Sequence, residues 1–265
     1  MRHLIFAGVL CGLVAVTARA DWAVVRTMRV NSPNELVEHR QAEVENAETG
    51  EHATVHLAVF KTKTATWRVV DQPSTPRADL AEAMTATQAL AGVNGGYFDP
   101  EDAPVGLLVN AGKKVTPQSS ARLLSGVLFA TPKRVDIVRA KRFRLSAEIR
   151  EAVQCGPLLL DAGKPVPGLN DTRVARRTFA AVSANGATAA LGYCSSVSLA
   201  QLGKILGLEK MAGAANFTRA LNLDGGSSSA FWVAQGNDAF SISELKTVRD
   251  FVAILPRTRS SRAER

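Results

Sequence analysis

Cysteine and histidine are scarce in this chain of 265 residues, which has three cysteines and four histidines. Paired Cys-x-x-Cys motifs are absent, and His52 and His56, four residues apart, lead into an alternating segment that is typical of a strand. On a strand, that spacing does not give the ligand geometry that a helix provides at a zinc site. We therefore expect the two histidines to be exposed or packed, and we expect no metal site and no cofactor.

Long hydrophobic runs are also missing. The longest run, Leu4–Val16, is shorter than the roughly 20 residues that a membrane-spanning helix needs. A basic start precedes it and the small-residue pattern Ala18-Arg19-Ala20 follows it, which together predict a signal peptide over residues 1–20 with cleavage before Asp21. The mature protein is then expected to be secreted, into the periplasm or out of the cell, with no stable membrane anchor.

A strong excess of one charge is lacking once the chain ends are set aside. The formal net charge is +8, of which Arg2 and Arg19 contribute two and the tail Arg257–Arg265 contributes three. The remaining three positive charges are scattered over the body of the chain, which argues against a nucleic-acid-binding surface. We interpret residues 256–265 as a solvated basic tail.

Removal of the signal peptide takes away Cys11 and leaves two cysteines, Cys155 and Cys194. Because disulfides persist in secreted proteins, a Cys155–Cys194 bridge is expected, and two buried thiols that behave as small apolar residues are the alternative. A catalytic cysteine is the weakest interpretation, because the histidines of the mature chain all lie in its N-terminal quarter.

Interior linkers and low-complexity segments are absent, and the apolar segments are short, which predicts a single α+β domain. We expect many short, mostly antiparallel strands with a few helices packed on the sheet. Thr54–Phe60 and Ala65–Val70 alternate like the two strands of a hairpin, whereas Arg77–Ala91 and Ser198–Leu206 have apolar residues at helical spacing, with Ser198 as a cap. Further short strands are expected at 105–109, 123–130, 135–138, 156–160, 178–183, 187–193, 221–223, 229–234 and 248–255.

Two Gly-Gly turns, each at the end of a short apolar strand, are the most unusual local feature. The first is Asn94-Gly95-Gly96-Tyr97-Phe98, and the second is Asn222-Leu223-Asp224-Gly225-Gly226, which continues into Ser227-Ser228-Ser229. Two glycines in a row let a ligand approach the backbone N–H groups, which suits an anion, and the serine hydroxyls would add donors. Either motif alone is also explained as a tight turn whose Asn or Asp bonds to its own backbone.

A third polar element, Arg176-Arg177-Thr178, stands at the start of a predicted strand. An arginine there is solvated in the usual case, but its planar guanidinium also matches the geometry of a phosphate group.

In order and combination, these segments resemble those of the phosphodiester glycosidases, the family that shares the domain of the mannose 6-phosphate uncovering enzyme. The two Gly-Gly segments, Gly156-Pro157-Leu158 and Arg177-Thr178 match the family's motifs. The chain departs from the family pattern at Ser227 and Ala181, where glycine is common, and these departures bear on the shape of the pocket. The resemblance runs from Val55 to Leu255, so we expect an N-terminal extension over 21–54 and a phosphodiester glycosidase domain over 55–255.

The resemblance implies hydrolysis of a sugar 1-phosphodiester, N-acetylglucosamine-like, at its glycosidic bond, which releases the sugar and leaves a phosphomonoester. Asp224 is then expected to stabilise an oxocarbenium-like centre or to activate water, and Arg177 to hold charge on the departing phosphate. The implied substrate-binding residues are Asn94, Gly95, Gly96, Tyr97, Phe98, Thr178, Gly225, Gly226, Ser227 and Ser228. Asp99, Glu101 and Asp102 are candidates for a second carboxylate, and the sequence does not choose among them or between retention and inversion.

Two other functions stay open from the residues alone. A secreted, non-catalytic module would bind envelope or extracellular glycopolymers through the same pocket. A phosphodiesterase that cuts the P–O bond on the other side of the phosphorus would require a strong nucleophile or metals, and the absence of clustered metal ligands counts against it.

Overall fold

The computed structural model describes residues 21–32, 35–211 and 213–257. The predicted signal peptide and residues 258–265 of the predicted tail lie outside the described residues. No helix in the described part of the chain is long and apolar enough to cross a bilayer.

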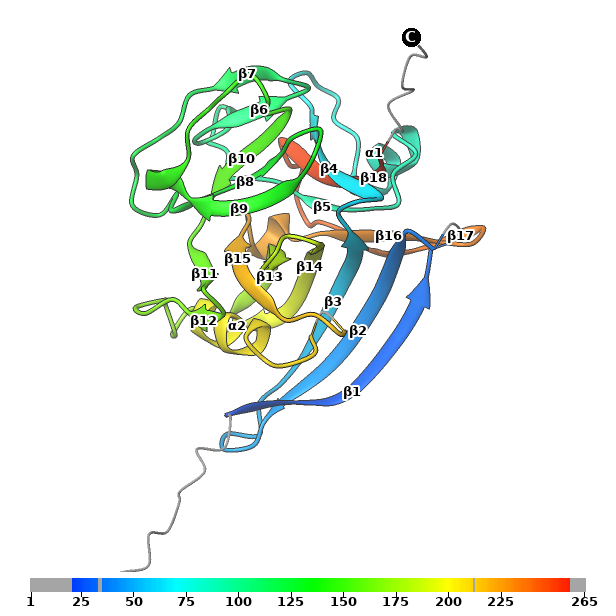
Figure 1. Ribbon diagram of the computed structural model, residues 1–265, viewed down its shortest axis with the longest axis vertical. Helices are drawn as coiled ribbons and strands as arrows, with labels where there is room; N and C mark the ends of the chain where they lie inside the picture. The colour runs from blue at the N-terminus through cyan, green and yellow to red at the C-terminus, as the bar shows by residue number, and fades with distance from the viewer. Residues whose placement is uncertain (1–20, 33–34, 212, 258–265) are drawn as a thin grey trace, which may run out of the picture.

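Three sheets make up the protein, and every strand pair in the described residues is antiparallel (Figure 1). The large sheet has eight strands in the order β1 (Trp22–Asn31), β2 (Val37–Asn46), β3 (His52–Lys61), β14 (Thr188–Val197), β13 (Ala175–Ser183), β15 (Phe217–Asn222), β11 (Leu158–Asp161) and β12 (Lys164–Pro165). The second sheet has five strands in the order β7 (Lys113–Thr116), β6 (Leu108–Asn110), β10 (Glu151–Cys155), β8 (Gly126–Ala130) and β9 (Val135–Arg139). The third sheet has five in the order β17 (Asp238–Ile242), β16 (Phe231–Gln235), β5 (Ala91–Asn94), β18 (Asp250–Pro256) and β4 (Ala65–Asp71). The predicted α+β class with mostly antiparallel strands is confirmed.

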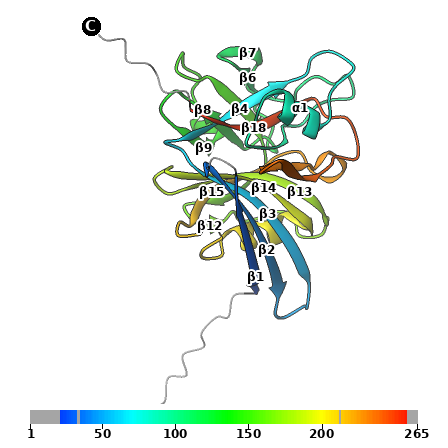
Figure 2. The ribbon, with the colours of Figure 1, turned by 90° about the vertical axis from the view of Figure 1, so that its right-hand side faces the viewer.

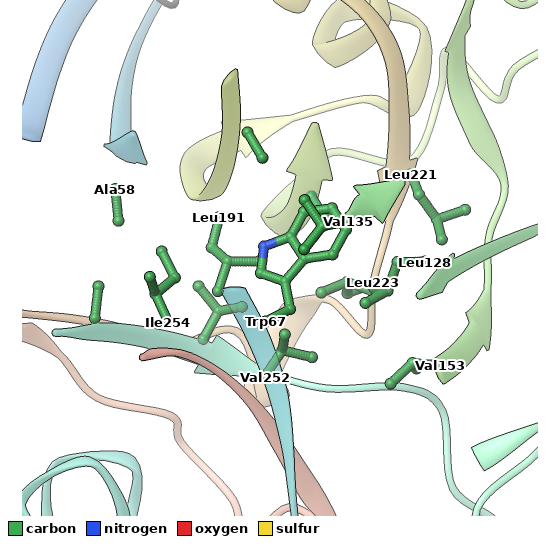
Figure 3. Close-up of a cluster of buried hydrophobic side chains, with 14 of the residues drawn as sticks. Ala58, Trp67, Leu128, Val135, Val153, Leu191, Leu221, Leu223, Val252 and Ile254 are labelled. Atoms are coloured by element: carbon green, nitrogen blue, oxygen red, sulfur yellow. The ribbon is translucent and has the colours of Figure 1, made fainter. Parts of the chain in front are cut away.

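The main apolar cluster takes side chains from all three sheets and so holds them together. Trp67 of β4 is 1% exposed and lies among aliphatic side chains that include Leu191 of β14 and Leu128 of β8 (Figure 3). Burial of such large side chains is the main favourable contribution to folding, about 25 cal/mol per Å² of apolar surface. Because each sheet contributes to one core, the ends of strands from different sheets are fixed relative to one another.

Two α-helices occur in the described residues, α1 (Leu80–Ala86) and α2 (Leu199–Leu206). The second agrees with the predicted helix, and Ser198 caps it in a reciprocal pair of hydrogen bonds with Gln201. The first is shorter than the predicted Arg77–Ala91. It begins after the Asp79 cap, and Gln88 has a φ of 52°, which turns the chain out of the helix before β5.

The predicted hairpin of the two segments around Lys61–Thr64 is wrong. β3 pairs with β2 and β14 in the large sheet, whereas β4 pairs with β18 at the edge of the third sheet. Both segments are strands, but the short connection between them crosses from one sheet to the other. Alternation identifies a strand and says nothing of its partner.

The N-terminal residues continue the large sheet. β1 and β2 extend it beyond β3, and together the three strands project away from the second sheet (Figure 2). The predicted extension over 21–54 therefore contains two full strands of that sheet, while its boundary as a domain stays a prediction.

Cys155 and Cys194 are free, fully buried thiols. Cys155 belongs to the main cluster and Cys194 to a second cluster that packs under α2, so the predicted disulfide is absent from the structure. Burial raises the pKa of both thiols, that of Cys194 to about 12, which keeps them protonated and unreactive. The alternative of two buried, apolar-like cysteines describes the structure.

Candidate active site

The predicted site residues meet where strand ends of the large sheet and the third sheet come together. β5 ends at Asn94 and β15 ends at Asn222, while Arg177 and Thr178 lie near the start of β13. In register, Asn222 is opposite Phe179 of β13, so the two motifs of the large sheet are neighbours. With the start of β18, whose Asp250 carbonyl accepts the Gly95 N–H, four segments distant in sequence converge at one place.

Asn94 links three of these segments. Its side chain is fully buried, and its Oδ1 accepts hydrogen bonds from the Thr178 hydroxyl at 2.7 Å and from the Ala230 N–H at 3.0 Å. Its Nδ2 donates to the backbone carbonyl of Asp224 at 2.8 Å. Both polar atoms of the Asn94 side chain are hydrogen-bonded within the protein. Asn94, held by Thr178, therefore positions the backbone of Asp224.

The first Gly-Gly turn is explained by Asp250, the first residue of β18. The Gly95 N–H donates to the Asp250 backbone carbonyl at 2.8 Å, and the Gly96 N–H donates to Asp250 Oδ1 at 3.1 Å. A Cβ on Gly95 would lie 1.6 Å from Asp250 Oδ1, so no larger residue fits there. Both amides are occupied, and the expectation that they are free to bind an anion is wrong for this turn.

Asp250 was not among the site residues predicted from the sequence. It is 2% exposed, and its Oδ2 has no hydrogen-bond partner among the described residues. Burial raises its pKa to about 7, and the Gly96 N–H bond and Arg249 offset only part of this effect. The available signal was the charged pair Arg249-Asp250 within the apolar segment 248–255, because a charge inside a buried strand needs a specific partner.

Asp224 is also hydrogen-bonded to the Gly95 backbone. Its backbone N–H donates to the Gly95 carbonyl at 3.1 Å, and its Oδ1 accepts the Gly225 N–H at 2.9 Å. Burial raises the pKa of this carboxyl, an effect partly offset by the Ser228 hydroxyl, the Lys246 ammonium and the Gly225 N–H. The side chain remains partly exposed, so it is available to a substrate.

Arg177 faces the second Gly-Gly turn. Its Nε donates to the Val197 carbonyl at 3.0 Å and its Nη2 to the Arg173 carbonyl, which fixes the guanidinium plane. The third nitrogen, Nη1, would lie 3.8 Å from a Cβ on Gly225 and has no hydrogen-bond partner among the described residues. Burial lowers the pKa of this guanidinium. The unused N–H groups of Nη1 lie beside Gly225, the residue that follows Asp224.

Arg176 is hydrogen-bonded to the end of the loop that follows Asp224. Its Nη2 donates to the carbonyls of Ser229 and Ser243, at 2.5 and 2.7 Å. Gly226 has a φ of 65° and starts a short turn through Ser228, in which the Gly226 and Ser227 amides have no partner in the described chain. These amides, rather than those of the first turn, are the ones open to an anion.

Tyr97 and Asn222 form a hydrogen-bonded group with the Gly156 carbonyl. The Tyr97 hydroxyl donates to the Gly156 carbonyl at 2.6 Å and accepts from Asn222 Nδ2 at 3.2 Å. Burial raises the pKa of Tyr97, which keeps this donor protonated. Phe98 lies under the Lys246 ammonium, whose Nζ is 4.5 Å from the ring centroid. Tyr97 therefore orders the Gly156-Pro157 segment that leads into β11. Lys246 is a second site residue that was not predicted from the sequence.

The three candidates for a second carboxylate lie in a turn after Phe98 and have other roles. Asp99 Oδ1 accepts the N–H groups of Glu101 and Ala103, at 3.1 and 2.8 Å. Asp102 forms an ion pair with Arg77 at 2.8 Å, and Glu101 is exposed. In the structure, the second acidic residue that bonds to the backbone of this turn is Asp250, whose carbonyl accepts the Gly95 N–H and whose carboxyl group accepts the Gly96 N–H.

The arrangement combines one accessible carboxylate with a cationic, donor-rich surface for an anion. Asp224 supplies the carboxylate, and Arg177 Nη1, Lys246 and the Gly226 and Ser227 amides supply positive charge and N–H donors. Such a site suits a reaction in which positive charge develops on one part of the substrate and negative charge on another.

Comparisons with known proteins identify the family of this chain. The sequence profile of the phosphodiester glycosidases matches residues 87–255, which include all four segments described above. The uncharacterized protein YigE of Escherichia coli (strain K12) is 33% identical over 91 residues, which are 32% of this chain and 36% of YigE, so the match spans about a third of that relative.

Two solved structures share the fold. The zebrafish N-acetylglucosamine-1-phosphodiester alpha-N-acetylglucosaminidase catalytic domain, auto-inhibited by its pro-peptide, has a TM-score of 0.63 at 15% identity, with 88% of each chain covered. A hypothetical protein from Synechocystis has a TM-score of 0.58 at 16% identity, with 83% of this chain and 62% of that chain covered. At such identities these likenesses show the fold alone, whereas the profile covers more than half of the chain. The chain belongs to the phosphodiester glycosidase family.

Proposed function

We propose that this protein is a secreted glycosidase that hydrolyses the sugar–phosphate glycosidic bond of a sugar 1-phosphodiester. The products are the free sugar and a phosphomonoester on the other alcohol. The observation that carries this proposal is that two groups adjoin Gly225: Asp224 Oδ1 accepts the Gly225 N–H, and the unused Nη1 of Arg177 would lie 3.8 Å from a Cβ on that glycine. The name of the zebrafish enzyme favours an N-acetylglucosamine-like sugar, and the N-terminal sequence supports secretion.

The roles of the two residues follow from the charges that develop. As the bond between the anomeric carbon and the phosphate oxygen breaks, the carbon becomes oxocarbenium-like and the phosphate gains negative charge. Asp224 stabilises the carbon centre or deprotonates the attacking water, and Arg177 with the Gly226 and Ser227 amides stabilises the phosphate. A phosphate ester leaves without strong protonation, so the site needs donors for an anion more than it needs a general acid.

Product analysis with a matched pair of variants tests this proposal. Protein that starts at Asp21 is incubated with an N-acetylglucosamine 1-phosphodiester, and free sugar and sugar 1-phosphate are measured separately. We expect free sugar, and a rate lowered by about a hundredfold or more in Asp224→Asn, because a positioned carboxylate contributes at least that much. Glu101→Gln, which removes an exposed carboxylate near the site, retains the activity of the parent.

Two outcomes contradict the proposal. Sugar 1-phosphate as the product moves the cleavage to the phosphorus side. Tight binding of the diester without turnover in the parent protein indicates the non-catalytic binding module.

A further inference from the structure

A cleft of about 710 Å³ lies between the second sheet and the β11–β12 hairpin. In Figure 1 this hairpin lies below β8 and β9 on the left of the molecule. Two loops form the cleft walls, residues 118–125 and 166–169, and β9 with the turn after it closes the back. The volume is within the range of sites that bind small molecules.

The residues that line the cleft include basic side chains and no acidic ones. Arg122, Arg139 and Lys141 line it, and no Asp or Glu does. Arg139 is paired with Asp161 at 2.6 Å, whereas Arg122 and Lys141 are exposed and have no acidic partner among the described residues. In a chain whose body has a small net charge, two unpaired cations in one cleft favour an anionic ligand.

The cleft wall is held rigidly by a buried side chain. Gln154 is 1% exposed, its Oε1 accepts the Ser119 N–H at 2.9 Å, and its Nε2 donates to the carbonyls of Ser119 and Leu124 at 2.7 and 3.0 Å. This fixes the loop that presents the hydroxyls of Ser119 and Ser120 and the guanidinium of Arg122. Hydroxyl groups on a fixed loop suit the hydroxyls of a sugar, and the cations suit a phosphate.

Two chain segments connect the cleft lining with residues of the candidate active site. Pro157 lines the cleft, and the carbonyl of the preceding Gly156 accepts the hydrogen bonds of Tyr97 and Asn222. The wall segment 166–169 leads along the chain to Arg173, whose carbonyl holds Arg177. Because Pro157 is one residue from the Gly156 carbonyl that Tyr97 and Asn222 bind, the cleft borders the candidate active site.

We propose that this cleft binds the neighbouring phosphodiester unit of a polymeric, phosphate-linked glycan while the terminal unit is hydrolysed. The inference rests on the proposed function and names the class of its substrate, an anionic glycopolymer rather than a single sugar phosphodiester. Arg122 and Lys141 contact the second phosphate, and the Ser119 and Ser120 hydroxyls contact the sugar between the two phosphates.

The dependence of kcat/KM on substrate length tests the cleft. We compare a one-unit N-acetylglucosamine 1-phosphodiester with a four-unit oligomer of N-acetylglucosamine 1-phosphate. The parent is expected to prefer the oligomer about tenfold, through a lower KM, and raised salt is expected to reduce this preference. The double variant Arg122→Gln/Lys141→Gln brings the ratio close to one, whereas Lys113→Gln/Lys114→Gln, with the same charge lost from the exposed β7 hairpin, keeps it.

A binding measurement separates the cleft from the catalytic proposal. The four-unit oligomer is titrated into Asp224→Asn protein, with and without the double substitution, so that turnover plays no part. We expect the double substitution to weaken binding about tenfold. Equal affinity with and without it, or equal kcat/KM for both substrates in the parent, overturns the inference, while loss of one-unit turnover alone contradicts only the proposed function.

Discussion

Gly95 shows how single residues determine the site. Its N–H donates to the Asp250 carbonyl, its carbonyl accepts from Asp224, and its Cα lies against the Asp250 carboxylate. The sequence motif correctly marked a place where side chains are excluded, but the group that excludes them is an aspartate of the protein and not a bound anion. The other residues that gather here were predicted from their motifs, whereas Asp250 offered only the signal of a charge in an apolar segment and Lys246 offered none.

Gly95→Ala is therefore expected to destabilise the protein strongly. Its Cβ would lie 1.6 Å from Asp250 Oδ1, so that the buried carboxylate or the β5 end must shift. We expect a loss of about 2–4 kcal/mol in the free energy of unfolding, measured by urea denaturation. Gly207→Ala is the control, because Gly207 has ordinary helical angles, and it stays within about 1 kcal/mol of the parent. Equal stability of the two variants would show that Asp250 does not pack against Gly95.

At the scale of elements, local signals predicted type better than partnership. The Ser198–Gln201 capping box and an apolar face identified α2, but nothing local to Ala65–Asp71 reveals that its partner is β18, nearly two hundred residues later. β2 was missed because its buried positions include His39 and Arg40, which interrupt the apolar alternation. These polar residues are buried because other elements cover them.

The cover over His39 is the β16–β17 hairpin. His39 and His56 lie 3.1 Å apart between Nε2 and Nδ1, and both rings pack against Phe240 of β17, His56 stacked and His39 tilted. The Gln235 amide approaches His39 Nδ1 at 2.7 Å, so a chain of hydrogen bonds runs from Gln235 through His39 to His56. This chain requires both rings to be neutral, because a protonated ring has no acceptor nitrogen.

We accordingly expect stability to fall in acid. Burial lowers the pKa of both histidines to about 4, while an unfolded chain titrates them near 6.5. The unfolded state binds protons first as the pH falls, so stability that is present above pH 6.5 is lost towards pH 4, by on the order of 3 kcal/mol for each histidine.

Urea denaturation between pH 4 and 8 measures this loss. The double variant His39→Gln/His56→Gln is expected to flatten the profile over this window, and His52→Gln, an exposed histidine on the same strand as His56, leaves it unchanged. A parent profile that matches that of the double variant would mean that the pair does not titrate with folding.

At the scale of the whole molecule, three sheets around one core bring the ends of β5, β15, β13 and β18 together. The motifs at the ends of β5, β13 and β15 follow the order of the family's motifs, which is why the family was predictable from the chain. The position of the site is a property of the assembled sheets, since Asn94 and Thr178 are far apart in sequence and 2.7 Å apart between Oδ1 and Oγ1. The cleft beside Pro157 arises in the same way, from the second sheet and one hairpin of the large sheet.

The bond that breaks is the central claim, and hydrolysis in water enriched in oxygen-18 tests it most directly. With an N-acetylglucosamine 1-phosphodiester as substrate, both products are analysed by mass spectrometry. Attack at the anomeric carbon, which the Asp224–Arg177 arrangement favours, places the heavy oxygen in the released sugar and none in the phosphomonoester. Heavy oxygen in the phosphate product would show cleavage at phosphorus and would contradict the account.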